Sequence, residues 1–349
     1  MLAVRFLPGL FAGLLVLTAA AKAEPRYHLE QTVALPGDGG WDYLAVDAPS
    51  QRLFIAHGTR VDVIDTGSLT RVGEVSDTPG VHGIAIATDL GRGYISAGRA
   101  NAVVVFDLKT LARIKDIKST GENPDAILYD GATRRVFAFN GRGRNATVID
   151  AVSNEVVGSI PLDAKPEFAR ADGTGRVYVN LEDKNSLAVI DARSLAVLSV
   201  IPLTGCDEPS GLALNAAAKR LFAVCDNHVM VAVDVASGRV LGSAPIGGGA
   251  DAADFDAGAQ LAFASNGDGT LTVVRQGAGG LPQAVSSVPT RRGARTMTLD
   301  EITHRIYLVT ADDGDTPAPT TEHPHPRPTI LPGTFRLLVV APDIKKADR

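Results

Sequence analysis

Several ingredients are scarce in this sequence of 349 residues. It has two cysteines and one tryptophan, and aromatic residues make up 5% of the chain. Two cysteines cannot build a framework of several disulfides, although they can form one bond in an oxidising compartment. Beyond Ala23, the sequence has no apolar run long enough to span a membrane and no sustained 3.6-residue periodicity. These absences argue against a disulfide-stapled miniprotein, a transmembrane segment and a helical bundle.

The first 23 residues differ in pattern from the rest of the chain. The segment from Met1 to Ala23 has the pattern of a secretory signal, with an apolar run from Phe6 to Ala19 and small residues at Ala21 and Ala23. We therefore expect a periplasmic or secreted protein.

Positive charge is also scarce in this chain. The rest of the chain has 32 basic and 39 acidic side chains, a net charge of −7. Nucleic-acid binding proteins normally show the opposite balance, because neutralising phosphates supplies much of their affinity. Nucleic acid is therefore not an expected partner.

What the sequence does contain is a repeat of about 42 residues. Alternating apolar segments such as VDVID and LAVID end in Asp at positions 65, 107, 150, 191 and 234, with degenerate copies ending at Arg275 and Ala341. The spacing is nearly constant up to Arg275 and lengthens only before the last copy. A second alternating series runs in phase, from RLFIA at residue 52 to RIYLV at residue 305. Period-two alternation with β-branched and aromatic residues indicates strands.

Seven such units predict an all-β fold, a seven-bladed β-propeller with four-stranded blades. The segment from Tyr27 to Gly37 resembles the outer strand of the other units, and the chain stops after a third strand near Ala341. We expect the N-terminal strand to pair with the last blade and close the ring, which leaves no open seam. The predicted organisation is a signal peptide (1–23), a monomeric propeller (24–342) with an insertion (312–334) in blade seven, and a tail (343–349).

Two copies, RVYVN (Arg176 to Asn180) and RVFAFN (Arg135 to Asn140), approach the motif after which the YVTN family of bacterial propeller repeats is named. The resemblance covers the whole chain after the leader. It implies a propeller with an extracytoplasmic binding role. A WD40 repeat is less favoured, because the lone Trp41 precedes a first strand and does not end a third one.

Strand order predicts which side chains share a face of the ring. If each blade runs a-b-c-d from the centre outwards, the d–a and b–c connections lie on one face, here called the upper face. One polar residue per blade stands at the start of the innermost strand, at the mouth of the channel, and we call this set the mouth ring: Asp42, His82, Asp125, Glu167, Ser210, Asp251 and Arg295. Rigid scaffolds often bind ligands at such positions. The alternative is a polar lining of a water-filled channel.

A second upper-face set follows the b strands. It comprises His57, Gly98, Arg99, Asn140, Glu182, Asp183, Asp226, Asn227, Asn266, Asp268, Asp312 and Asp313.

His57 and His82 come from adjacent blades and could meet near Asp42 or Asp125, which would give a divalent metal two imidazoles and a carboxylate. No dense ligand motif such as HExxH accompanies them, and loop histidines are commonly just solvated.

Two further functions compete for the mouth ring. The first is recognition of a small molecule or partner protein with a cationic group by Asp42, His57, His82, Asp125, Glu167, Asp251 and Arg295. The second is lactonase- or lyase-type catalysis, with His82 as the base, Glu167 as an acid or metal ligand and Arg295 as the oxyanion stabiliser. No catalytic family motif is present, so the sequence leaves enzyme and binding scaffold both open, with the binding scaffold preferred.

The opposite face has a regularity of its own. Arginine opens strand b in six units, at Arg52, Arg92, Arg135, Arg176, Arg220 and Arg305. A basic ring for anions is one interpretation. We favour a repeated turn salt bridge to the Asp-type residue that ends strand a. The Asp residues that end the VxVxD segments are expected to accept backbone N–H groups in turns.

Two local features complete the prediction. Cys206 precedes strand a and Cys225 ends strand b of the fifth blade, so antiparallel pairing brings them together and predicts a disulfide. The alternative, a thiolate metal site, would need His228 as a third ligand.

The insertion DDGDTPAPTTEHPHPRPTILPGTF is rich in proline, so it should be extended. Its HPHP segment (323–326) could bind a metal or serve as a spacer, and TRRGAR (290–295) places three arginines beside the mouth.

Overall fold

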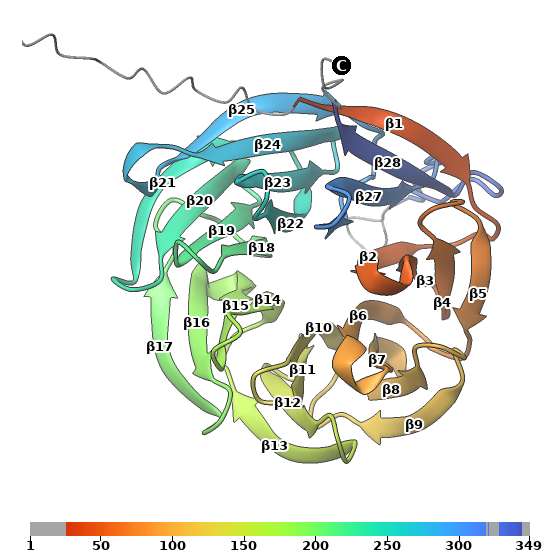
Figure 1. Ribbon diagram of the computed structural model, residues 1–349, viewed down its shortest axis with the longest axis horizontal. Coiled ribbons are helices and arrows are strands. Elements are labelled where there is room, and N and C mark those ends of the chain that lie inside the picture. Colours follow the sequence, from red (N-terminus) through yellow and green to blue (C-terminus); the bar gives the residue numbers. More distant parts are fainter. Residues whose placement is uncertain (1–25, 319, 321–327, 344–349) are drawn as a thin grey trace, which may run out of the picture.

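The computed structural model describes residues 26–318, 320 and 328–343. The predicted signal peptide and the HPHP segment lie outside these residues. The described residues contain twenty-eight strands, which form seven four-stranded antiparallel sheets arranged as blades in a ring (Figure 1). The prediction of an all-β, seven-bladed propeller is therefore confirmed. Within the described ranges no helix is long and apolar enough to cross a membrane.

The strands follow one another from the channel outwards in each blade. Blade 1 contains β2 (Trp41–Asp47), β3 (Arg52–His57), β4 (Arg60–Asp65) and β5 (Arg71–Val75). Blade 2 contains β6 (Val81–Ala87), β7 (Arg92–Ala97), β8 (Ala102–Asp107) and β9 (Arg113–Lys118). Blade 3 contains β10 (Pro124–Asp130), β11 (Arg135–Asn140), β12 (Asn145–Asp150) and β13 (Glu155–Pro161). Blades 4 and 5 contain β14 (Pro166–Ala171), β15 (Arg176–Leu181), β16 (Ser186–Asp191) and β17 (Ala196–Pro202); and β18 (Pro209–Asn215), β19 (Arg220–Cys225), β20 (Val229–Asp234) and β21 (Arg239–Pro245). Blade 6 contains β22 (Ala250–Asp256), β23 (Leu261–Asn266), β24 (Thr270–Gln276) and β25 (Pro282–Pro289).

Blade 7 joins the two ends of the chain. Its inner strands are β26 (Met297–Asp300), β27 (Arg305–Thr310) and β28 (Arg336–Pro342), and its outer strand is β1 (Tyr27–Ala34). β1 pairs antiparallel with β28, from Tyr27 opposite Pro342 to Ala34 opposite Arg336. Figure 1 shows this pair completing the circle. The predicted closure by the N-terminal strand is confirmed, and it leaves no unpaired seam between the described first and last blades.

The hydrophobic core is divided among the contacts between blades. Seven clusters of buried side chains are present, and each combines residues of two neighbouring blades. Between blades 1 and 2, for example, Phe54 packs against Phe106 with ring centroids 5.7 Å apart. Both faces of each strand are therefore buried in the inner part of a blade, which explains its nearly continuous apolar sequence.

Three of the six repeated arginines link blades, which differs from the prediction, whereas Arg176, Arg220 and Arg305 pair with Asp191, Asp234 and Glu30 of their own blades. In blades 1 to 3 each guanidinium donates to two carbonyl oxygens in the turn between the third and fourth strands of the next blade. The pairs are Arg52 with Leu108 and Lys109, Arg92 with Ala151 and Val152, and Arg135 with Ala192 and Arg193. The expected salt bridge across the turn is wrong, because Asp47 and Asp130 accept hydrogen bonds from Ser50 and Thr133 of their own turns.

The aspartates that end the VxVxD segments are turn residues, as predicted. Asp65 Oδ1 accepts hydrogen bonds from the backbone N–H groups of Gly67 and Ser68, at 3.1 and 2.7 Å. These bonds lower the pKa of Asp65, with the backbone and hydroxyl groups of Ser68 as the largest causes. Asp107, Asp150, Asp191 and Asp234 repeat the arrangement.

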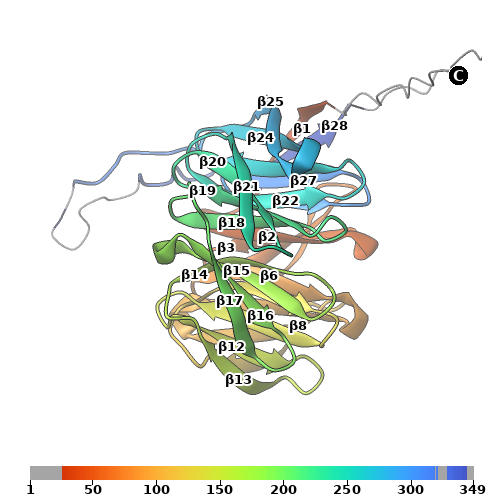
Figure 2. The same cartoon turned by 90° about the vertical axis from the view of Figure 1, so that its left-hand side faces the viewer.

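Two features shape the upper face. Cys206 and Cys225 form a disulfide with a Cα–Cα distance of 5.3 Å, which confirms the predicted pair. The insertion lies between β27 and β28, as expected, and its described part contains a bridge between Asp313 and Ile330. Seen edge-on, the described residues of the insertion project from one face of the disc (Figure 2).

We predict that Arg135→Ala lowers the free energy of unfolding by about 1–2 kcal/mol, because two carbonyl oxygens of the next blade lose a charged donor. Denaturant titration at neutral pH measures the change. Arg291→Ala is the matched control, since Arg291 is exposed, and its effect should stay below about 0.5 kcal/mol. Equal effects of the two substitutions would contradict a link between blades.

Removing the disulfide with Cys206→Ser and Cys225→Ser together is expected to cost about 3 kcal/mol, because the closed loop no longer restricts the unfolded chain. Denaturation without reductant measures this loss, and reductant should not change the double variant further. Mass measurement of the unreduced protein provides the direct check, and two free thiols would contradict the assignment.

Candidate functional site

In six blades the mouth-ring residue occupies the same position in the innermost strand. It is the second residue of β2, β6, β10, β14, β18 and β22. In each of these strands the pairing register with the neighbouring strand shifts within the first four residues. A β-bulge turns a side chain away from the regular alternation, and bulges are common beside functional sites. Arg295 supplies the seventh position from the loop before β26.

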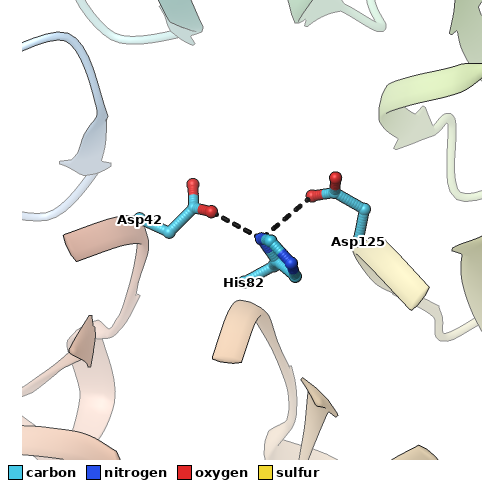
Figure 3. A group of neighbouring side chains, drawn as sticks. All are labelled: Asp42, His82 and Asp125. Carbon is cyan, nitrogen blue, oxygen red and sulfur yellow. Dashed lines mark hydrogen bonds and ion pairs between the residues drawn. The ribbon is translucent and has the colours of Figure 1, made fainter. Parts of the chain in front are cut away.

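Three mouth-ring residues from adjacent blades form a contact cluster. His82 Nδ1 lies 2.7 Å from Asp42 Oδ2 and 3.7 Å from Asp125 Oδ1. Figure 3 shows the three side chains converging from β2, β6 and β10. The side chains of Asp42, His82 and Asp125 are 21%, 26% and 16% exposed, so solvent still reaches the cluster. An imidazole therefore stands between two carboxylates at the channel mouth.

Glu167 is the next acid around the ring and has its own cation. Lys165 Nζ lies 2.7 Å from Glu167 Oε1 and also contacts Glu182. Lys165 comes two residues before the mouth-ring position, where five of the other six blades have glycine or asparagine. The sequence prediction missed this lysine, and its departure from the repeat at that position was the available signal.

The remaining ring members, Ser210, Asp251 and Arg295, also form polar contacts. Arg295 Nε lies 3.4 Å from Asp251 Oδ2, and Ser210 Oγ donates to the carbonyl oxygen of Ala250 at 3.0 Å. Ser210 therefore caps a neighbouring strand. The Arg295–Asp251 pair connects blades 6 and 7 across the mouth.

Tyr43 lies beneath the ring and was also missed. It is only 6% exposed, and its ring packs edge-on against Phe168 at 5.1 Å. Burial raises the pKa of Tyr43 well above its usual value, and the charges of Asp251, Glu167, Asp125 and Asp42 raise it further. The hydroxyl therefore lies within electrostatic reach of all four acids.

Burial and charge together change the protonation of the ring. Desolvation raises the pKa of Asp125 to about 6, and it raises that of Glu167 to about 8 with help from the charge of Asp125. Burial opposes the charged form of His82, but the hydrogen bond to Asp42 and the charge of Asp125 outweigh it and raise the pKa to about 9. At neutral pH the cluster therefore contains an imidazolium between two carboxylates, next to a protonated Glu167.

His57 does not take part in this cluster. Its side chain is fully buried, Nδ1 lies 2.7 Å from Asp62 Oδ2, and its ring packs on Phe335 at 4.2 Å. Burial raises the pKa of Asp62, but hydrogen bonds from His57 and Arg60 outweigh this effect and bring it to about 2. The expected meeting of His57 and His82 is therefore wrong. The last residue of β3 faces the blade interior, whereas the bulge in β6 turns His82 towards the channel.

The insertion meets the ring beside blade 1. A pocket of about 280 Å³ is lined by Gly40, Trp41, Gly293, Arg295, Asp313, Pro328 and Ile330. Arg292 Nε lies 3.5 Å from Asp313 Oδ2, so the basic TRRGAR segment holds the described base of the insertion. A second pocket of about 350 Å³ adjoins His82 and includes Arg99, Asn123 and Arg142. Both pockets open on the upper face.

Each of the three catalytic candidates has an ion-pair partner of its own in or beside the ring. His82 is bonded to Asp42, Glu167 to Lys165, and Arg295 to Asp251. The acids expected to be available to a cationic ligand are likewise paired with cations of the ring itself. What the arrangement offers is a rigid circle of alternating charges with an acidic excess.

The raised pKa values predict how stability depends on pH. Glu167 has a pKa of about 8 when folded against an ordinary 4.5, so the folded state binds more protons between these values. The free energy of unfolding should therefore fall as the pH rises from about 5 to 8. His82 adds stability below its ordinary pKa of 6.5, which is lost as the pH rises through about 9. Glu167→Gln should flatten the change between pH 5 and 8, measured by denaturant titration.

Glu122→Gln is the matched control, because Glu122 is exposed on the same face and its substitution should leave the slope unchanged. A wild-type protein that becomes more stable towards pH 8 would contradict the protonation of Glu167.

Comparison with known proteins supports the fold alone. No family model matches the chain, and no curated protein matches it. Solved structures do match. A structure of U3-55K has a TM-score of 0.70 at 10% identity and covers 90% of this chain and 98% of its own. The WD40 repeats of RRP9 reach 0.74 at 10% identity, with 91% and 99% covered, and a chain of the mitotic checkpoint complex reaches 0.71 at 11%, with 86% and 95% covered. The chain thus has a seven-bladed propeller fold like that of these WD40 proteins.

Proposed function

We propose that this protein is an exported scaffold that binds a small molecule or a partner protein at the mouth ring. The observation that carries the proposal is the convergence of polar side chains from all seven blades on one rim, where several are costly to bury. Maintaining such charges requires compensating pairs and does not follow from the needs of the hydrophobic core. Ligand sites commonly combine a rigid scaffold with a few converging polar groups.

Export is supported by two features of the chain. The segment from Met1 to Ala23 has the pattern of a secretory signal, and Cys206 is bonded to Cys225. Disulfides persist in oxidising compartments. The RVYVN and RVFAFN motifs favour membership of the YVTN repeat family, whose members include extracytoplasmic binding proteins.

A ligand with a cationic group fits the ring best. Five carboxyl groups lie at the mouth, those of Asp42, Asp125, Glu167, Glu182 and Asp251, against the three cations of His82, Lys165 and Arg295. With Glu167 protonated, four carboxylates still outnumber three cations. The ring and its direct partners, with Glu182 included, therefore have a small negative excess, which attracts positive charge. Arg99 and Arg142 line the adjoining pocket, outside this set.

One observation favours the alternative, a lactonase- or lyase-type enzyme at the same mouth. Glu167 has a pKa of about 8, raised by burial and by the charge of Asp125. A carboxylic acid that stays protonated at neutral pH can act as a general acid. Turnover of a lactone panel that is abolished by His82→Ala and by Glu167→Ala would favour the enzyme.

The scaffold predicts selective binding of cationic probes. Trp41 is the only tryptophan and lines the pocket beside Arg295, so its fluorescence reports on the mouth. We expect lysine-rich peptides or polyamines to change this signal, with at least a roughly tenfold affinity loss in Asp125→Asn. Asp116→Asn is the matched control, because Asp116 is exposed on the outer strand β9 and paired with Arg113. Equal binding by both variants, or binding of anionic probes alone, would overturn the proposal.

A further inference from the structure

The cluster of Asp42, His82 and Asp125 has the composition of a metal site. One imidazole nitrogen and one oxygen from each carboxylate all lie within 4.8 Å of one another. The three side chains come from strands of three consecutive blades, and β6 packs against both β2 and β10. The closed ring therefore fixes the spacing of the three donors before any ion arrives.

The orientation of His82 is also fixed. The edge of its ring that bears Nε2 faces Gly98, where a Cβ atom would lie only 2.7 Å from Nε2. Glycine at this position leaves room for the imidazole, and Nδ1 is directed towards the two carboxylates. A ligand set whose imidazole is oriented in advance loses less conformational entropy on binding.

A neighbouring buried group reports on the charge of this level of the channel. Tyr43 is more than nine-tenths buried, and the charges of Asp251, Glu167, Asp125 and Asp42 all act on its hydroxyl. Negative charge is therefore concentrated beside the cluster, where a bound cation would be stabilised.

We propose that Asp42, His82 and Asp125 bind a divalent transition-metal ion at the mouth of the channel. The ion takes the place of the proton on His82 Nδ1 and contacts one oxygen of each aspartate. A mixed nitrogen and oxygen set suits Zn²⁺ or Mn²⁺, whereas Ca²⁺ and Mg²⁺ prefer oxygen ligands alone. The open side of the ion faces the channel, where water or a ligand can complete its coordination.

This proposal concerns the same face as the proposed function but does not depend on it. Without a metal, the three residues form a closed ion triad, and the mouth can still bind cationic groups. With a metal, the local charge is reversed and an anionic group can approach the ion. The experiment therefore measures metal binding directly and does not use ligand binding as its readout.

The test uses the whole exported protein, purified without a His tag and stripped of metal. Calorimetric titration with ZnCl₂ and with MnCl₂ should give one ion per chain, with CaCl₂ binding much more weakly. Asp42→Asn, His82→Gln and Asp125→Asn should each weaken binding at least roughly tenfold. The amide variants keep the shape of the side chains, and each variant's melting transition without metal shows whether it is folded.

Two controls separate this site from others. Asp116→Asn changes an exposed acid on the outer strand β9, away from the cluster, and should leave the affinity unchanged within about threefold. The double variant His323→Ser with His325→Ser removes the imidazoles of the insertion and should bind as the wild type does.

Three outcomes overturn the proposal. One is no binding by the wild type up to about 1 mM Zn²⁺ or Mn²⁺, which leaves the cluster as an ion triad. Another is unchanged binding in the three cluster variants. The third is loss of binding in the double histidine variant alone, which places the ion on the insertion.

Discussion

The pairing of β1 with β28 is the contact on which the rest of the ring depends. Each blade buries apolar side chains against two neighbours, and an open ring would expose the faces of blades 7 and 1 to water. The strand that closes the circle comes from the other end of the chain, so blade 7 is complete only when the chain is complete. Arginines that reach from one blade to the next reinforce the same geometry on the lower face.

Closure also determines the chemistry of the channel mouth. Seven innermost strands converge on one axis, so a polar side chain at the same position of each blade becomes a ring of close neighbours. Bulges at the start of six of these strands direct the side chains inwards. Acids this close cannot all be ionised without compensation. In this ring the compensation comes from the cations His82, Lys165 and Arg295 and from the protonation of Glu167.

Much of this arrangement could be predicted from the sequence, because the repeat carries it. The number of blades, the closing strand, the disulfide and the mouth-ring positions all follow from spacing and strand order. The partners of those positions did not follow. Lys165 stands outside the aligned position, and Tyr43 looks like an ordinary aromatic residue of a strand. The repeated arginines were assigned to their own turns, whereas Arg52, Arg92 and Arg135 reach carbonyl groups in the next blade, far along the chain.

The sequence by itself determined which residues occupy each blade and which face they reach, because period-two alternation and antiparallel order are local properties of the chain. Only the tertiary structure decided which of those residues touch. His57 and His82 occupy comparable faces of adjacent blades, yet one is buried beside Asp62 and the other stands between Asp42 and Asp125. The bulge in β6 turns His82 towards the channel, whereas the end of β3 places His57 inside the blade. Both placements are set by packing between distant segments, which no local pattern encodes.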